Sequence, residues 1–264
     1  MTIKPITCKS LDSGILEVGG CLATDLVKEY GSPLYVMDAE TLRQNCNDYL
    51  EVFKEHHSNS VVAYASKALL TVGIARFMSK LGMGFDVCSG GEIFTLLKAD
   101  VDMQTVYFHG NNKSVDELEL AIKHSVRIVL DNEDELDRII SISKSNKIQT
   151  RVLVRLKPEI EAHTHEYIKT GQIDSKFGVD KHELIPFIKR ILEVPELEFL
   201  GIHAHIGSQI FDTDPYHDLV DIMVSYIEQI QQETGASVQE LDLGGGFGIQ
   251  YIDSDDPPNV KDVL

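Results

Sequence analysis

The sequence is short of basic residues and of paired cysteines, and each shortage excludes a class of function. Its 24 lysines and arginines face 42 acidic residues, for a formal net charge of -18. Such a chain repels phosphate backbones and anionic lipid headgroups, so we expect no nucleic-acid partner and no membrane partner. The four cysteines form no C-x-x-C pair. Free thiols are therefore favoured over a disulfide framework or a zinc site.

Long apolar segments are also missing. No run of about 18 apolar residues is present, which predicts no membrane-spanning helix. The first residues, MTIKPITCKSLDSG, lack the apolar core of a signal peptide. We therefore expect a cytoplasmic protein. With 264 residues, of which 43% are hydrophobic and 25% charged, the chain can form one large α/β domain or two small ones.

What the sequence does contain is a regular alternation of two patterns. Apolar, β-branched runs predict strands at residues 61–66, 84–87, 106–108, 127–130, 151–155, 199–203 and 238–243. Helical periodicity predicts helices at residues 69–81, 92–98, 115–124, 133–143, 184–192 and 216–232. Ahead of these, helices are expected at 22–30 and 40–54, the second capped by Asp38, and a strand at 33–37. The alternation predicts an α/β fold with a parallel sheet.

The placement of reactive residues favours a barrel over an open sheet. Such residues follow most of the predicted strands: Lys67, Asp86, His109, Asp131, Arg155, His205 and the Gly244 loop. In a TIM-type (β/α)8 barrel all these strand ends converge on one mouth, whereas an open sheet concentrates function at one switch point. Seven strands are present, so we expect an incomplete barrel over residues 39–264 and a short N-terminal segment over residues 1–38.

Two motifs suggest where chemistry occurs. Lys67 interrupts the stretch VVAYASKALL, residues 61–70, with no acidic residue within ten positions. A lysine there either extends to solvent or serves as a Schiff-base lysine, which needs a desolvated amine. The turn LDLGGGFG, residues 241–248, directly follows a predicted strand. Its glycines allow backbone N–H groups to approach an anion and predict a phosphate site, although a tight turn without a ligand is the alternative.

Histidines occur in two further segments. GIHAHIGSQI, residues 201–210, contains His203 and His205, then Ser208. Two histidines at this spacing are a weak metal signal. An imidazole can instead stack on a cofactor ring beside a phosphate held by Ser208, and we expect His203 to be a core histidine bonded to backbone. The long connection after Arg155 contains His163, His165 and Tyr167, which belong either to a functional lid or to a solvated loop.

The ordered set YASKA, GFDVCSGGEI, HGNNKS, HEYIKTG, SKFG, HAHIGSQ and LDLGGGFG resembles the diaminopimelate decarboxylase family. This family belongs to the fold III group of pyridoxal-phosphate enzymes, and the resemblance covers nearly the whole chain. It implies pyridoxal 5'-phosphate as cofactor and meso-2,6-diaminopimelate as amino-acid substrate, with L-lysine and carbon dioxide as products. It also implies a homodimer for the full-length protein.

The resemblance assigns roles residue by residue. Lys67 resembles the lysine that holds pyridoxal phosphate covalently, and His205 resembles the histidine on the face of its ring; both are expected to be catalytic. The remaining positions expected to bind the cofactor are Asp86, Arg155, Ser208, Gly244, Gly245 and Gly246. The connection from Arg155 to Gly178 matches the lid over the substrate.

Some of the family's features are not found. The sequence contains no Glu-Pro dipeptide of the Glu-Pro-Gly-Arg motif, no Cys-Glu-Ser-Gly-Asp motif and no C-terminal β-domain. We therefore expect a decarboxylase sequence that is cut short, inactive as an isolated chain and prone to associate along its open sheet. The alternatives are a non-catalytic pyridoxal-phosphate-binding barrel fragment and a decarboxylase of the ornithine or arginine type.

Overall fold

The structure is a computed structural model that describes residues 4–57, 59–158 and 176–263. These residues form two compact units. One comprises Met1–Ser60 with Gly248–Leu264, and the other is Val61–Phe247. The division between an N-terminal segment and a barrel at residue 38 stays a prediction.

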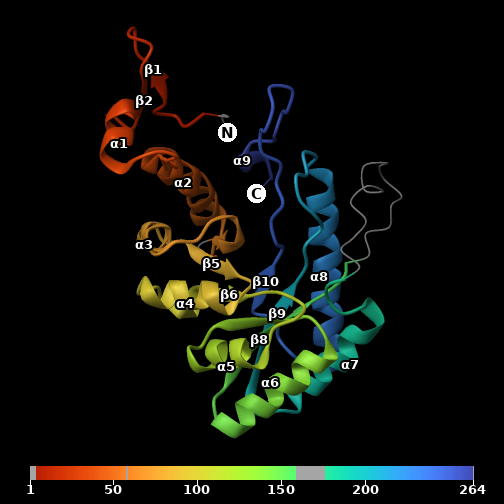
Figure 1. Cartoon of the computed structure of the whole chain (residues 1–264). Coiled ribbons are helices and arrows are strands. Elements are labelled where there is room, and N and C mark those ends of the chain that lie inside the picture. Colours follow the sequence, from red (N-terminus) through yellow and green to blue (C-terminus); the bar gives the residue numbers. More distant parts are fainter. Residues whose placement is uncertain (1–3, 58, 159–175, 264) are drawn as a thin grey trace. The chain divides into compact units, whose positions relative to one another are not determined.

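The larger unit contains a seven-stranded parallel sheet, in which each strand pairs with the strands next to it in sequence. Its strands are β4 (Ala63–Ala65), β5 (Gly84–Val87), β6 (Val106–Phe108), β7 (Arg127–Leu130), β8 (Thr150–Arg155), β9 (Leu197–His203) and β10 (Glu240–Asp242). The sheet curls with helices on its outer side (Figure 1). This arrangement confirms the incomplete TIM-type barrel.

Helices connect successive strands of this unit. They are α3 (Val72–Lys80), α4 (Gly90–Lys98), α5 (Val115–Lys123), α6 (Glu133–Asn146), α7 (Lys181–Leu192) and α8 (Asp214–Thr234), with 3-10 turns η1 (Ser66–Ala68) and η2 (Met103–Thr105). Polar caps begin several of them. Ser114 accepts a hydrogen bond from the Glu117 N–H, and the Glu117 side chain bonds back to Ser114. Such a capping box satisfies N–H groups that lack partners within the helix.

The core of this unit lies on both faces of the sheet. Tyr107, Val129, Leu153 and Leu200 form one cluster of buried residues, with one residue from each of β6 to β9. Fully buried apolar residues of the strands and helices, such as Phe108, Leu118 and Phe187, contribute further burial. Burying this apolar surface stabilises the strands, so their carboxyl ends are held in fixed positions.

The smaller unit has its own antiparallel sheet and helices. The sheet contains β1 (Lys9–Ser10), β2 (Leu16–Val18) and β3 (Cys21–Leu22), and the helices are α1 (Ala23–Tyr30), α2 (Ala39–His56) and α9 (Val260–Val263). Asp38 caps α2 by accepting hydrogen bonds from the N–H groups of Glu40 and Thr41, as predicted. Among the described residues, no helix is both long and apolar enough to cross a bilayer.

Two predicted strands need correction. Residues 33–37 form no strand, and Tyr35 is 97% exposed. A strand needs a neighbouring strand for its backbone groups, and this segment has none among the described residues. The strand predicted at 61–66 is reduced to β4, which is an outer strand of the sheet, and Ala63 is exposed. The apolar letters of VVAYAS therefore do not mark a buried central strand.

Candidate functional site

The carboxyl ends of the parallel strands bring polar side chains together. Asp86 lies in β5, His109 follows β6, Arg155 and His203 end β8 and β9, and Asp242 ends β10. Strand register aligns these ends, because Arg155 and Asp242 both pair with His203. The convergence that the sequence predicted is therefore present in the larger unit.

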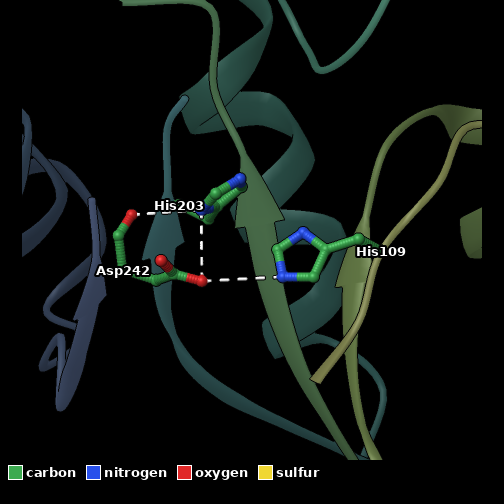
Figure 2. A group of neighbouring side chains, drawn as sticks. All are labelled: His109, His203 and Asp242. Carbon is green, nitrogen blue, oxygen red and sulfur yellow. Dashed lines mark hydrogen bonds and ion pairs between the residues drawn. The ribbon is translucent and has the colours of Figure 1, made fainter. Parts of the chain in front are cut away.

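At the centre of this mouth, His109, His203 and Asp242 form a compact cluster (Figure 2). The Asp242 Oδ2 atom is 3.2 Å from His203 Nδ1 and 3.6 Å from His109 Nε2. His203 Nδ1 is also 3.1 Å from the main-chain oxygen of Asp242. The expected backbone bond of His203 is thus present, but His203 also pairs with a carboxylate, which the sequence reasoning did not include.

Asp86 extends this cluster toward Lys67. Its Oδ1 atom lies 3.9 Å from His109 Nε2. Burial and, after it, the charge of Asp242 raise the pKa of Asp86 to about 7, while His203 and Lys67 act in the opposite direction. Asp242 behaves differently: burial alone would raise its pKa, but the charge and hydrogen bond of His203 hold that pKa well below its usual range. The site therefore contains one ionised carboxylate and one that titrates near neutrality.

The two other histidines of the mouth are neutral at physiological pH. Burial, followed by the charge of His203, lowers the pKa of His109 well below its ordinary value. The same two causes, with Arg155 and Lys67 after them, lower the pKa of His205 to about 4. The influence of Lys67 and Arg155 on His205 means that these three predicted site residues share one neighbourhood.

Lys67 lies at the edge of the parallel sheet. It belongs to the turn η1, just beyond β4, and its side chain is exposed. Its exposure agrees with the interpretation in which Lys67 extends to solvent, and its role in holding a cofactor stays a prediction; β4 is an outer strand of the sheet. The charge of Lys67 nevertheless acts on Asp86 and His205, so Lys67 lies near the same mouth.

The glycine turn has a conformation that side chains would block. Gly244 and Gly246 have φ values of +69° and +106°. A Cβ atom on Gly246 would lie 2.0 Å from the Gly207 oxygen, and one on Gly244 would lie 2.8 Å from His205 Nδ1. Only glycine tolerates such close approach with a positive φ. The turn is thereby held directly against His205 and the segment that carries Ser208.

Hydrogen bonds leave part of this turn available to a ligand. The Gly244 N–H donates to Asp242 Oδ1 at 2.8 Å, and the Gly246 oxygen accepts from the Ile210 N–H at 2.9 Å. Within the described part of the chain, the N–H groups of Gly245 and Gly246 and the Ser208 hydroxyl have no hydrogen-bond partner. Space is open beside the Cα of Gly245. Unused donors beside open space fit a phosphate group.

Arg155 lies at the edge of the mouth. Its guanidinium carbon is 4.4 Å from the centre of the Phe177 ring. Nearby, the Gly178 N–H donates to Asp131 Oδ1, which fixes the start of the segment leading to α7. The predictions for His163, His165 and Tyr167, and most of the expected lid, lie outside the described residues.

Two functional features were missed by the sequence reasoning. Asp242 stands inside the quoted motif LDLGGGFG, but only its glycines were considered. Lys113 forms a buried ion pair with Glu135 at 2.7 Å and also donates to the oxygens of Gly110 and Val129. The motif HGNNKS contained the lysine, but its partner lies 22 residues away, and nothing local in the sequence connects them.

Comparison with known proteins gives consistent results. Residues 39–264 match the family described as "Pyridoxal-dependent decarboxylase, pyridoxal binding domain". The chain is 42% identical to a diaminopimelate decarboxylase of Synechocystis sp., over 98% of this chain and 57% of that protein. It is 38% identical to the Bacillus subtilis enzyme of the same name, over 98% of this chain and 60% of that protein.

Solved structures agree with these relatives. The crystal structure of diaminopimelate decarboxylase from M. jannaschii in complex with L-lysine superposes with a TM-score of 0.90 at 33% identity. The match covers 98% of this chain and 61% of that one. A lysine/ornithine decarboxylase from Vibrio vulnificus, at 21% identity and a TM-score of 0.74, shares the fold. The chain thus spans about three fifths of the length of these proteins.

Proposed function

This chain belongs to the pyridoxal-dependent decarboxylases, and from that premise we propose that it forms the cofactor-binding part of an enzyme that converts meso-2,6-diaminopimelate to L-lysine and carbon dioxide. The observation that carries the proposal is the similarity to diaminopimelate decarboxylases along 98% of the chain. The convergence of Lys67, His205 and the glycine turn at the mouth of the barrel supports it.

When bound, pyridoxal 5'-phosphate supplies the electron sink that accepts the electron pair left by the departing carboxylate. Lys67 is proposed to hold the cofactor covalently through its amine. An exposed lysine beside the mouth can be reached by both cofactor and substrate. The neutral ring of His205, with a pKa of about 4, presents a flat apolar face without a charge to desolvate.

The phosphate is proposed to bind the turn from Gly244 to Gly246 together with Ser208. The N–H groups of Gly245 and Gly246 and the Ser208 hydroxyl supply the donors. Gly244 contributes by its conformation, because its own N–H donates to Asp242. Hydrogen bonds from such donors to an ionised phosphate are stronger than those between neutral groups.

Asp86 and Arg155 are proposed to handle charge around the bound cofactor. The Asp86 carboxyl, with a pKa of about 7, can hold or release a proton beside Lys67 at physiological pH. The guanidinium group of Arg155 can orient an anionic group at the edge of the mouth. The substrate of this reaction carries two carboxylates, so a fixed cation there favours its binding.

Two finer aspects of the proposal concern the setting of the protein. We expect the full-length protein to form a homodimer, because the resemblance to the diaminopimelate decarboxylase family implies one. We also expect it to act in the cytoplasm, where amino-acid biosynthesis takes place. Light scattering of the purified protein and fractionation of cells that produce it test these two expectations.

The experiment that tests the function measures carbon dioxide release by the product of the full reading frame that encodes these 264 residues. The substrates are meso-diaminopimelate, L-ornithine and L-arginine, each with added pyridoxal phosphate. We expect release from diaminopimelate with L-lysine as product, and none from the Lys67→Ala variant. Release from ornithine or arginine alone would assign the other branch of the family. Cofactor binding without release from any substrate would indicate a non-catalytic binding protein.

A further inference from the structure

Asp242 uses both oxygens of its carboxylate, and they point to different parts of the site. Oδ1 accepts the Gly244 N–H at 2.8 Å. Oδ2 lies 3.2 Å from His203 Nδ1 and 3.6 Å from His109 Nε2, as Figure 2 shows. The main-chain oxygen of the same residue accepts the Ala204 N–H at 3.0 Å. One residue therefore connects the glycine turn, the end of β9 and the loop after β6.

The bond to Gly244 determines which way the turn faces. With its N–H committed to Asp242, Gly244 adopts a φ of +69°, and the chain passes close to Ala204 and His205. The next two N–H groups, of Gly245 and Gly246, then have no partner among the described residues. A turn of three glycines has many accessible conformations. A fixed bond at its first residue selects one of them.

The ionised carboxylate of Asp242 is by itself unfavourable for phosphate binding, because an anion beside a phosphate site repels the ligand. Its partners offset that cost: the Gly244 N–H and the two imidazoles surround it, and its side chain is 28% exposed. Asp242 also occupies the Gly244 N–H, which a bound phosphate could otherwise use. The arrangement favours phosphate binding only if the fixed geometry of the turn stabilises the complex by more than the repulsion destabilises it. Asp242 therefore has a structural role toward the turn, and its carboxylate does not bind the phosphate directly.

A metal ion is the other occupant that two histidines and an aspartate suggest. The position of His203 argues against it. Its Nδ1 atom lies 3.1 Å from the main-chain oxygen of Asp242 as well as 3.2 Å from the carboxylate. A protonated Nδ1 satisfies both oxygens, whereas a metal-bound Nδ1 would direct no proton at the main-chain oxygen. The cluster is therefore a hydrogen-bonded network.

We propose that Asp242 is a positioning residue that holds the Gly244–Gly246 turn in its phosphate-binding conformation, through the Gly244 N–H on one side and the His203–His109 pair on the other. This inference rests on the proposed cofactor and deepens the account of its binding. It assigns to Asp242 the discrimination between phosphorylated and unphosphorylated ligands.

The test compares two probes, pyridoxal 5'-phosphate and pyridoxal, which differ only in the phosphate. Dissociation constants are measured by absorbance for the unaltered protein, Asp242→Ala, Asp242→Asn and the control Asp221→Ala, an exposed residue of α8. We expect Asp242→Ala to weaken pyridoxal phosphate binding at least tenfold and pyridoxal binding less than twofold. Asp242→Asn retains an oxygen for the Gly244 N–H and should lose less. The control should match the unaltered protein.

A second readout needs no ligand. In the unliganded protein, hydrogen exchange of the Gly244 N–H should be slow, and at least tenfold faster in Asp242→Ala, with the amides of β9 unchanged. If Asp242→Ala weakened binding of both probes by the same factor, the cause would be general unfolding, and the positioning role would be overturned. The same holds if Asp242→Ala left both dissociation constants unchanged. If the unaltered protein bound one zinc ion per chain and His109→Ala lost it, the cluster would be a metal site and not a hydrogen-bonded network. If the unaltered protein itself binds neither probe, the proposed function fails.

Discussion

At the residue scale, two side chains of the site lead to predictions: the hydroxyl of Ser208, a hydrogen-bond donor, and the carboxyl of Asp86, whose pKa is raised. Ser208 is exposed beside the glycine turn and has no hydrogen-bond partner among the described residues. Replacing it with alanine should weaken pyridoxal phosphate binding by about 1.5–3 kcal/mol, because one hydrogen bond to a charged group is lost. Absorbance titration measures this. Ser225→Ala on α8, which removes a hydroxyl bonded to a helix carbonyl, is the matched control and should bind normally. Equal affinities in all three proteins would remove Ser208 from the site.

Asp86 gives the protein a pH-dependent stability. Its pKa is 3.8 in an unfolded chain and about 7 in the folded one, first because of burial and then because of Asp242. Between these values the folded state holds a proton that the unfolded state has lost, so the contribution of Asp86 to stability falls as pH rises through about 7. The charged groups that act on it are Asp242, His203, Lys67 and Glu92, with His109 in contact.

The expected result follows from comparing Asp86→Asn with the unaltered protein. The asparagine keeps the shape but cannot ionise. The free energy of unfolding of the variant minus that of the unaltered protein should therefore increase from pH 5 to pH 8. Urea unfolding at both pH values measures it. A difference independent of pH would contradict the raised pKa.

At the element scale, a buried ion pair ties the loop after β6 to helix α6. The side chains of Lys113 and Glu135 are each 1% exposed, and Lys113 Nζ makes hydrogen bonds of 2.7, 2.8 and 2.7 Å to Gly110, Val129 and Glu135. Glu135 also accepts the Asp131 N–H. Removing one member leaves the other charge buried without compensation, which costs about 3–5 kcal/mol.

We therefore expect Lys113→Met and Glu135→Leu each to reduce the free energy of unfolding by about 3–5 kcal/mol, and the double variant to lose less than the sum. Denaturant unfolding of the unaltered protein, the two single variants and the double variant gives a double-mutant cycle, from which the interaction energy of the pair is obtained. Arg43→Met, which breaks an exposed pair with Glu40, is the control and should change stability by less than about 1 kcal/mol. Additive losses in the double variant would show that the two side chains do not interact.

The order of elements in the larger unit could be predicted from the sequence because each helix and strand has a local signal. The bounds of β5, β6 and β7 agree with the prediction, since apolar runs with clear turn residues delimit them. The absence of a strand at 33–37 and the outer position of β4 could not be predicted. In both cases the outcome depends on whether a neighbouring strand is present, and local sequence does not encode that. The Asp242 network depends on contacts between β6, β9 and β10 that no local pattern reveals.

At the scale of the whole molecule, the sheet has two outer strands. Within the described residues, β4 and β10 each pair with one neighbour. Unpaired strand edges promote association between chains. We expect the 264-residue chain to self-associate with rising concentration in sedimentation velocity, and Ala63→Lys, on the exposed side of β4, to weaken this. Ser141→Lys on α6 adds the same charge elsewhere and should have no effect. A chain that stays monomeric at all concentrations would contradict the expectation.

The central claim is that Lys67 holds pyridoxal phosphate at the mouth of this barrel. The most direct measurement is borohydride reduction of the protein mixed with pyridoxal phosphate, followed by peptide mapping with mass spectrometry. The account predicts a single pyridoxyl-phosphate group on the peptide that contains Lys67. It also predicts no label in Lys67→Ala, whose fold should be unaffected because the side chain is exposed. Label on a different lysine, or equal labelling of the Lys67→Ala variant, would contradict it.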